Sequence, residues 1–191
     1  NQLTTAAFRD FGVVSAAGSN PLLAMEPLGQ SSRRTSLVLS EIMYHPADTR
    51  GTINTNGQGI VTNSLEFVES FNTRGEFQDL SGFRLEGNIS YTFPAGTVIP
   101  GGGFVVVARF PVDVQNVYGI TGVFGPFTNN LPNNQGTVRL ISQGGGVLLE
   151  TDYDSVAPWP VAADGAGHSL VLARPSYGEN NPQAWAASDA I

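Results

Sequence analysis

Residues 104–109 read Phe-Val-Val-Val-Ala-Arg, and three glycines at 101–103 come directly before them. A short apolar run bounded by turn residues predicts a buried β-strand. Similar short, mostly apolar stretches recur between turn signals along the chain. They are residues 37–44, 65–71, 83–86, 91–93, 97–99, 137–142, 147–153 and 168–173.

These segments predict an all-β protein, an antiparallel β-sandwich of about eight or nine strands. No amphipathic helix longer than two turns stands out between them, which argues against alternating strands and helices. Residues 48–63, rich in Gly, Asn and Thr, predict a long loop. Residues 1–36 contain much Ala, Ser, Gly and Pro and are interpreted as a linker or the end of a preceding unit. The domain is therefore expected to occupy residues 37–191.

The composition removes several classes of function. The 191-residue chain has no Cys, which excludes disulfide frameworks, zinc ribbons and cysteine nucleophiles. All nine basic residues are Arg, so a Walker A loop or a Schiff-base lysine is impossible. A net charge of −7 disfavours binding to nucleic-acid phosphates. No apolar run approaches the roughly 18 residues of a membrane span. Because the chain begins with Asn, we expect a processed piece that lacks any signal peptide.

Glutamates interrupt the apolar strand segments at positions 41, 66 and 69, where burying a carboxylate is costly unless it is paired. Side chains alternate along a strand, so Glu66 and Glu69 should point to opposite faces of the sheet. They therefore cannot form a glycosidase pair, whose carboxyl groups lie roughly 5–10 Å apart across one bond. We expect one glutamate to be exposed and another to bond to backbone or to an arginine such as Arg84 or Arg139.

The polar residues at strand ends do not assemble a catalytic motif. His45 and His168 are expected to be surface residues at strand edges. The sequence Gly-His-Ser-Leu-Val at 167–171 resembles a nucleophile elbow, but Val171 stands where the second glycine is required and a strand follows. Ser169 is therefore predicted to be a serine at the start of a strand, and no enzymatic activity is expected.

Two glycine triplets, residues 101–103 and 144–146, could suggest a phosphate-binding loop. Each joins two predicted strands, however, and no helix N-terminus follows to supply free amides. Both triplets are predicted to be hairpin turns.

Calcium and carbohydrate are the two small ligands that the sequence leaves open. Asp152 and Asp154 end a predicted strand and face the same way, so they are candidate calcium ligands, with Asp164 nearby in sequence. The favoured interpretation is that these acids are solvent-exposed turn residues, and no metal or other cofactor is expected. Phe124 and Phe127, around Gly-Pro in a loop, are candidates for stacking on a sugar.

Eight motifs, in order, resemble the lamin tail domain family in its bacterial branch. They include Leu-Val-Leu-Ser-Glu-Ile-Met-Tyr-His-Pro at 37–46, Leu-Glu-Phe-Val-Glu-Ser-Phe-Asn at 65–72, Pro-Gly-Gly-Gly-Phe-Val-Val-Val-Ala at 100–108, Gly-Thr-Val-Arg-Leu at 136–140, Pro-Trp-Pro at 158–160 and Asn-Pro-Gln-Ala-Trp at 181–185. The likeness covers about residues 37–188. It implies an immunoglobulin-like sandwich without enzymatic activity, in which Trp159 and Trp185 each cap an end.

The resemblance further implies an accessory module of a larger exported bacterial protein, secreted or at the cell surface. We therefore expect a non-catalytic role in adhesion, docking or domain spacing, with a protein or a cell-surface polymer as partner and no role for nucleic acid. A calcium- or carbohydrate-binding module with its site on the loops is the alternative. The sequence does not decide the oligomeric state.

Overall fold

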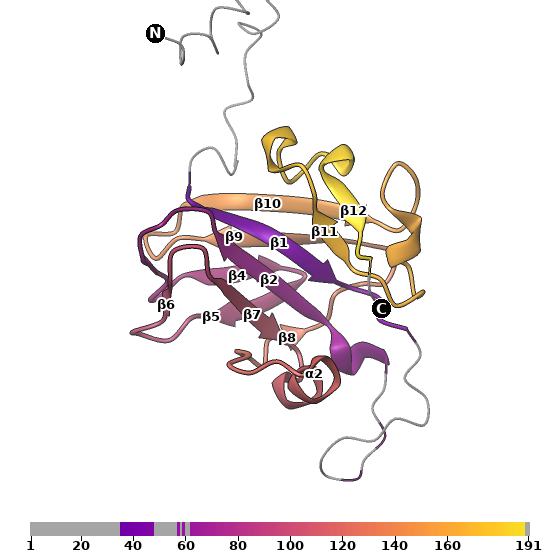
Figure 1. Cartoon of the computed structure of the whole chain (residues 1–191), viewed down its shortest axis with the longest axis horizontal. Coiled ribbons are helices and arrows are strands. Elements are labelled where there is room, and N and C mark those ends of the chain that lie inside the picture. Colours follow the sequence, from indigo (N-terminus) through magenta and orange to yellow (C-terminus); the bar gives the residue numbers. More distant parts are fainter. Residues whose placement is uncertain (1–34, 48–56, 58, 60–61, 190–191) are drawn as a thin grey trace, which may run out of the picture.

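The computed structural model describes residues 35–47, 57, 59 and 62–189, which form two stacked β-sheets (Figure 1). The first, here called the β1 sheet, has the order β12-β11-β1-β2-β7. Its strands in that order are Trp185–Ala187, Leu170–Leu172, Leu37–Met43, Phe67–Asn72 and Phe104–Ala108. The second, the β9 sheet, has the order β10-β9-β4-β5-β8. Its strands are Val147–Asp154, Gln135–Ile141, Arg84–Gly87, Ile89–Thr92 and Thr128–Asn129.

All paired strands within these sheets are antiparallel, so the predicted all-β sandwich is confirmed. A small additional sheet pairs β3 (Gln78–Asp79) with β6 (Val98–Ile99). The described residues contain twelve strands, three of them only two residues long. Eight of the nine predicted segments coincide with longer strands, and the ninth, residues 97–99, coincides with the two-residue β6. The sequence pattern does not predict β3, β8 or β12, because two or three residues are too few to show an alternation.

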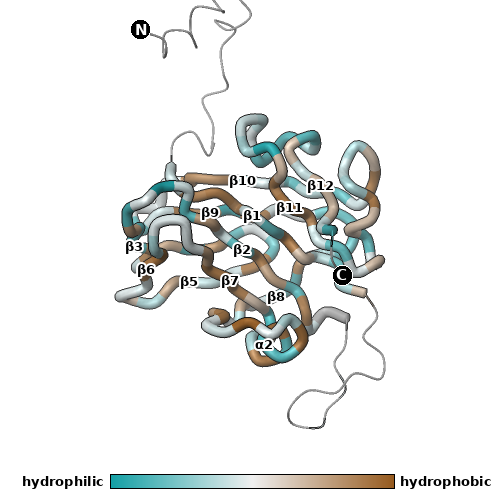
Figure 2. The backbone as a smooth tube through the Cα atoms, viewed as in Figure 1, coloured by the Kyte–Doolittle hydropathy of each residue, from teal (hydrophilic) through white to brown (hydrophobic). Residues whose placement is uncertain are grey.

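The core lies between the two large sheets because alternate side chains of each strand point inward. Leu37, Leu39 and Ile42 of β1 are fully buried in one cluster with Leu85 of β4 and Leu140 of β9. Figure 2 shows hydrophobic stretches along the strands of both layers. Burial of an aliphatic side chain contributes roughly 1.5–3 kcal/mol, so this core is the main source of stability.

One α-helix, α2 (Pro111–Tyr118), was not predicted and packs on the outside of the sandwich. Pro occupies its first turn, and Gly119 ends it in the left-handed conformation with a φ of 67°. Val114 is buried against Met43 and Phe67, so the helix covers one end of the outer face of the β1 sheet (Figure 1). No helix among the described residues is long and apolar enough to cross a membrane. Short 3₁₀ helices occupy Thr62–Leu65, Val161–Ala163, Pro175–Tyr177 and Pro182–Ala184.

The two glycine triplets have different roles. The predicted hairpin at residues 144–146 is confirmed, because β9 and β10 pair on either side of it. The prediction for residues 101–103 is wrong, because the flanking strands β6 and β7 belong to different sheets. A Cβ atom on Gly101 would lie 2.1 Å from the backbone carbonyl carbon and oxygen of Gly75. Glycine is thus required at position 101 for the close approach of two backbone segments.

Replacing Gly101 with alanine is expected to lower the free energy of unfolding by about 1–3 kcal/mol, since the two backbone segments must separate. Gly144→Ala is the matched control, because a Cβ atom there meets nothing within 4 Å. Urea unfolding of both variants measures the difference. Equal stability of the two variants would contradict the close approach.

The C-terminal strands are part of the same fold, since β11 pairs with β1 and β12 pairs with β11. Trp159 and Trp185 are both buried, and their ring centroids lie only 6.1 Å apart. The interpretation of both tryptophans as buried structural residues is thus confirmed, and their two rings lie together at one site. Residues 1–34 of the expected linker, and most of the expected loop at 48–63, lie outside the described residues.

Candidate functional site

A groove of about 620 Å³ lies on the outer face of the β1 sheet, the face that points away from the core. Tyr118 and Ile120, at the end of α2 and just after it, line one side, and residues 186–189 line another. The volume lies within the roughly 300–1,000 Å³ that is usual for ligand sites. The apolar side chains between these segments are Met43, Phe67, Val106 and Val171.

A β-bulge in β1 brings an acid to this outer face. Leu37 and Leu39 point into the core, and strict alternation would send Glu41 inward as well. The register with β2 shifts between Leu39 and Glu41, so that Ser40 is an extra residue. Ile42 then points into the core, and Glu41 lines the groove instead.

Glu41 of β1 and Glu69 of β2 are directly opposite each other in the sheet and both line the groove. The Ser40 hydroxyl donates a hydrogen bond to Glu69 Oε1 at 2.8 Å, and the Ser169 hydroxyl donates one to Glu41 Oε1. Partial burial raises the pKa of both carboxyl groups, and the charge of Glu41 raises the pKa of Glu69 further. The groove therefore contains two carboxylates whose negative charges repel each other.

Tyr118 links the helix wall to this acid pair. Its ring packs edge-on against Phe67, with centroids 5.8 Å apart. Burial and the charge of Glu41 raise the pKa of the Tyr118 phenol, so the hydroxyl stays neutral. Asp189, an exposed residue, adds a third carboxylate to the groove lining.

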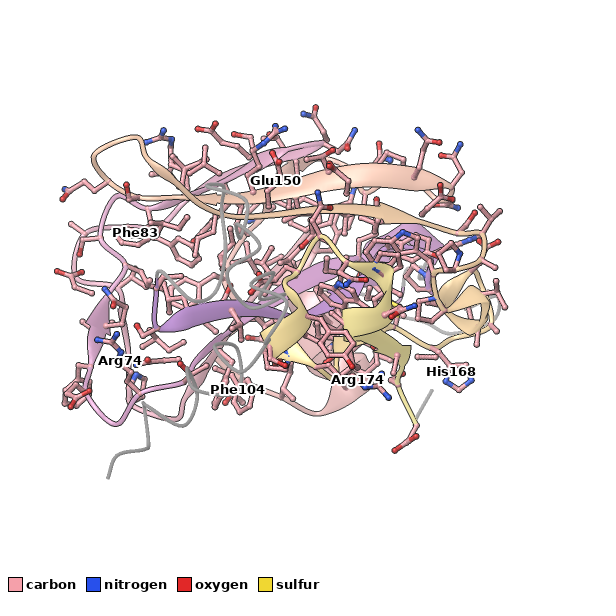
Figure 3. All side chains as sticks on the ribbon, turned by 90° about the horizontal axis from the view of Figure 1, so that it is seen from above. Arg74, Phe83, Phe104, Glu150, His168 and Arg174 are labelled. Atoms are coloured by element: carbon pink, nitrogen blue, oxygen red, sulfur yellow. The ribbon has the colours of Figure 1, made fainter. Side chains whose placement is uncertain are left out.

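Three arginine side chains of the described residues form ion pairs with acids other than Glu41 and Glu69. The recorded arginine ion pairs are Arg84–Glu86, Arg109–Glu66 and Arg139–Glu150. Figure 3 shows Glu150 on the layer opposite Phe104 and His168. No arginine contact with Glu41 or Glu69 is found within the part of the chain that the structure describes. The expectation that one of the three glutamates bonds to backbone or to an arginine is confirmed by Glu66, but the arginine is Arg109 and not Arg84 or Arg139. The expectation that another of them is exposed is wrong, because Glu41 and Glu69 are both partly buried.

Glu66 lies on the opposite side of β2 from Glu69, as predicted, and its side chain is fully buried. Its Oε2 accepts a hydrogen bond from the Leu131 amide at 3.0 Å. Its Oε1 is 3.6 Å from Nη1 of Arg109, too far for a hydrogen bond. Burial raises the pKa of Glu66 to about 7, although the Leu131 amide and the Arg109 charge act to lower it. Glu66 fixes the loop around Leu131 and does not reach the groove.

The histidines and the serine of the elbow-like sequence are held in separate contacts. His45 Nδ1 lies 2.5 Å from Asp164 Oδ1, and His168 Nδ1 lies 2.6 Å from the Ser188 carbonyl oxygen. The Ser169 side chain is buried and donates to Glu41. Among the described residues, the hydroxyl of Ser169 is thus bonded to a carboxylate and not to an imidazole.

The two phenylalanines suggested for sugar stacking are packed into the molecule. Phe127 is 3% exposed and belongs to the core. Phe124 packs on that core, its ring edge-on to Phe93 at 6.1 Å, and its backbone bonds to Val106 and Ala108 of β7. The two residues lie in a loop, as expected, but Phe127 is too buried to stack on a sugar, and Phe124 is only partly exposed.

Asp152 and Asp154 both line one small cavity beside β9, together with Tyr153 between them. The two carboxylate oxygens of Asp152 accept hydrogen bonds from Thr137 and Asn180, and Asp154 accepts one from the Val156 amide. Asp164 pairs with His45 instead. In residues 35–47 and 62–189, no group of three or more His, Asp or Glu side chains is placed to hold a metal ion.

The comparisons with known proteins agree with the fold. The family model of the lamin tail domain matches residues 30–155, about two thirds of the chain. No curated protein sequence matches this chain. Ser169, Val171 and residues 186–189, which line the groove, lie beyond the matched residues. The match and the immunoglobulin-like β-sandwich show that this chain belongs to the lamin tail domain family.

Proposed function

We propose that this domain is a non-catalytic interaction module of a larger exported bacterial protein, and that it docks a protein partner through the groove on the β1 sheet. The observation that supports this best is the carboxylate pair in a largely apolar groove. A sandwich needs only its inner faces for folding, and charged residues on the outer face normally lie open to water. Here the two acids are partly buried between apolar walls instead.

A non-catalytic role is supported by how the reactive groups are used. Ser169 and Ser40 each hold a glutamate, and His168 bonds to a backbone carbonyl oxygen. These contacts fix the shape of the groove and do not activate a nucleophile. The exported context is supported by the likeness to the bacterial branch of the family.

Filling the groove is expected to abolish binding of a partner. Ala186→Trp places an indole in the groove lining, whereas Ala95→Trp places the same side chain in the exposed turn between β5 and β6. Short peptides are selected from a displayed random library on the wild-type domain and measured on both variants. We expect the selected peptides to bind the Ala95→Trp variant normally and the Ala186→Trp variant at least about tenfold more weakly, a loss of about 1.4 kcal/mol.

Thermal unfolding shows whether each variant is folded, and Val171→Trp fills the same groove from β11 if Ala186→Trp destabilises β12. Peptides that bind both filled variants as well as the wild-type domain would contradict docking in the groove. The absence of any enriched peptide would contradict a peptide-docking role.

A further inference from the structure

The charges in the groove define the chemistry of its occupant. Glu41 and Glu69 are directly opposite residues on neighbouring strands, which places their Cβ atoms roughly 4.5–5.5 Å apart. Like charges at that separation destabilise a sheet. Each carboxylate receives one serine hydrogen bond, although an ionised carboxyl group can accept about four. A cation between the two groups would remove the repulsion and use the remaining acceptor sites.

The walls favour an organic cation over a metal ion. Calcium requires about six to eight oxygen ligands, whereas aliphatic and aromatic side chains surround this acid pair. An arginine side chain suits both parts of the groove. Its methylene stem packs on apolar surface, and its planar guanidinium is weakly hydrated and donates to carboxylates in pairs. Tyr118 and Phe67 add aromatic surface beside the acids.

The negative charge around the groove and on the whole chain also favours a cationic occupant. Asp189 contributes another negative charge to the groove lining, and the chain as a whole carries a net charge of −7. A negative groove with low-dielectric walls attracts cationic groups and speeds their association.

We infer that the groove binds an arginine side chain of a protein partner, with its guanidinium between Glu41 and Glu69. This inference rests on the proposed docking role of the groove and adds the chemistry of the group that enters it. Val171 and Val106 flank the two acids in the sheet register, one on each side, so apolar surface for the aliphatic stem lies next to either carboxylate.

The probe for this inference is N-acetyl-arginine amide, compared with N-acetyl-citrulline amide, which has nearly the same shape without the charge. Amide chemical shifts of the domain are followed by NMR during titration. We expect saturable shifts around Val106, Val171 and Ala186 with the arginine compound and at least about fivefold weaker binding of the citrulline compound. Glu41→Gln and Glu69→Gln should each weaken arginine binding at least fivefold, as expected for loss of one charge-assisted contact.

Glu76→Gln is the matched control, because it removes the same charge from an exposed residue outside the groove lining. It should leave arginine binding unchanged. Equal binding of the two compounds, or equal effects of all the glutamine variants, would overturn the inference. If selected peptides lose binding on filling the groove but show no preference for arginine, the arginine inference fails and the docking role stands. If arginine binds while no peptide is selected, the docking role fails instead.

Discussion

The free energy of unfolding is expected to fall by about 2–3 kcal/mol as pH rises from about 5 to 8, because of Glu66. The pKa of this buried carboxyl group is about 7 in the folded protein, against an ordinary value of 4.5. Between those two values the folded state holds a proton that the unfolded state has lost. The stabilisation is therefore complete at pH values below the pKa of Glu66 in the unfolded state. It is lost as the pH rises through the pKa of Glu66 in the folded state. Burial also raises the pKa of Glu41 and Glu69, which adds to the fall.

Urea unfolding followed by tryptophan fluorescence at several pH values measures this dependence. Glu66→Gln keeps an oxygen that can accept from the Leu131 amide but cannot titrate, so its stability should change much less with pH. Glu150→Gln, at a partly exposed ion pair with Arg139, should keep the wild-type dependence. A wild-type stability that rises between pH 5 and 8, or a Glu66→Gln variant with the full dependence, would contradict this account of the buried carboxyl group.

The sequence predicts the layers of this fold well because their long strands carry a clear pattern. Runs such as residues 104–109 and 37–44 are apolar and bounded by turn residues, and both form strands of the β1 sheet. The helix α2 is missed because its eight residues bury only Asp113 and Val114, too few to show a helical period. Its Pro111 and Gly119 are the boundary signals that could have located it.

Only part of the candidate site can be predicted from the sequence. Alternation correctly separates Glu66 from Glu69, although Glu66 directly precedes β2 and only Glu69 lies within that strand. The pairing of Glu41 with Glu69 depends on the register between two strands and on the bulge at Ser40. No residue type marks such a bulge, because it forms where packing of Leu39 and Ile42 requires it. The position of Ser169 beside Glu41 depends on contacts 128 residues apart in the chain.

Replacing Trp185 with alanine is expected to cost about 3–5 kcal/mol of stability, the largest effect of any substitution proposed for this chain. The side chain is 4% exposed, and its ring lies beside that of Trp159. Its indole N–H donates to the Glu179 carbonyl oxygen at 2.8 Å. The family match ends at residue 155, yet Trp185 begins β12, which pairs with β11 and so supports β1.

Urea unfolding of Trp185→Ala and Tyr177→Ala separates this role from general effects of shortening a side chain. Tyr177 is 53% exposed in the same C-terminal segment, so its replacement should change stability by less than about 0.5 kcal/mol. Should Trp185→Ala fail to fold, Trp185→Phe, which keeps most of the ring but loses the hydrogen bond, should give a smaller, measurable loss. A loss below about 1 kcal/mol for Trp185→Ala would mean that the sandwich does not depend on its last strands. The groove, whose lining includes residues of β11 and β12, would then lack a stable wall.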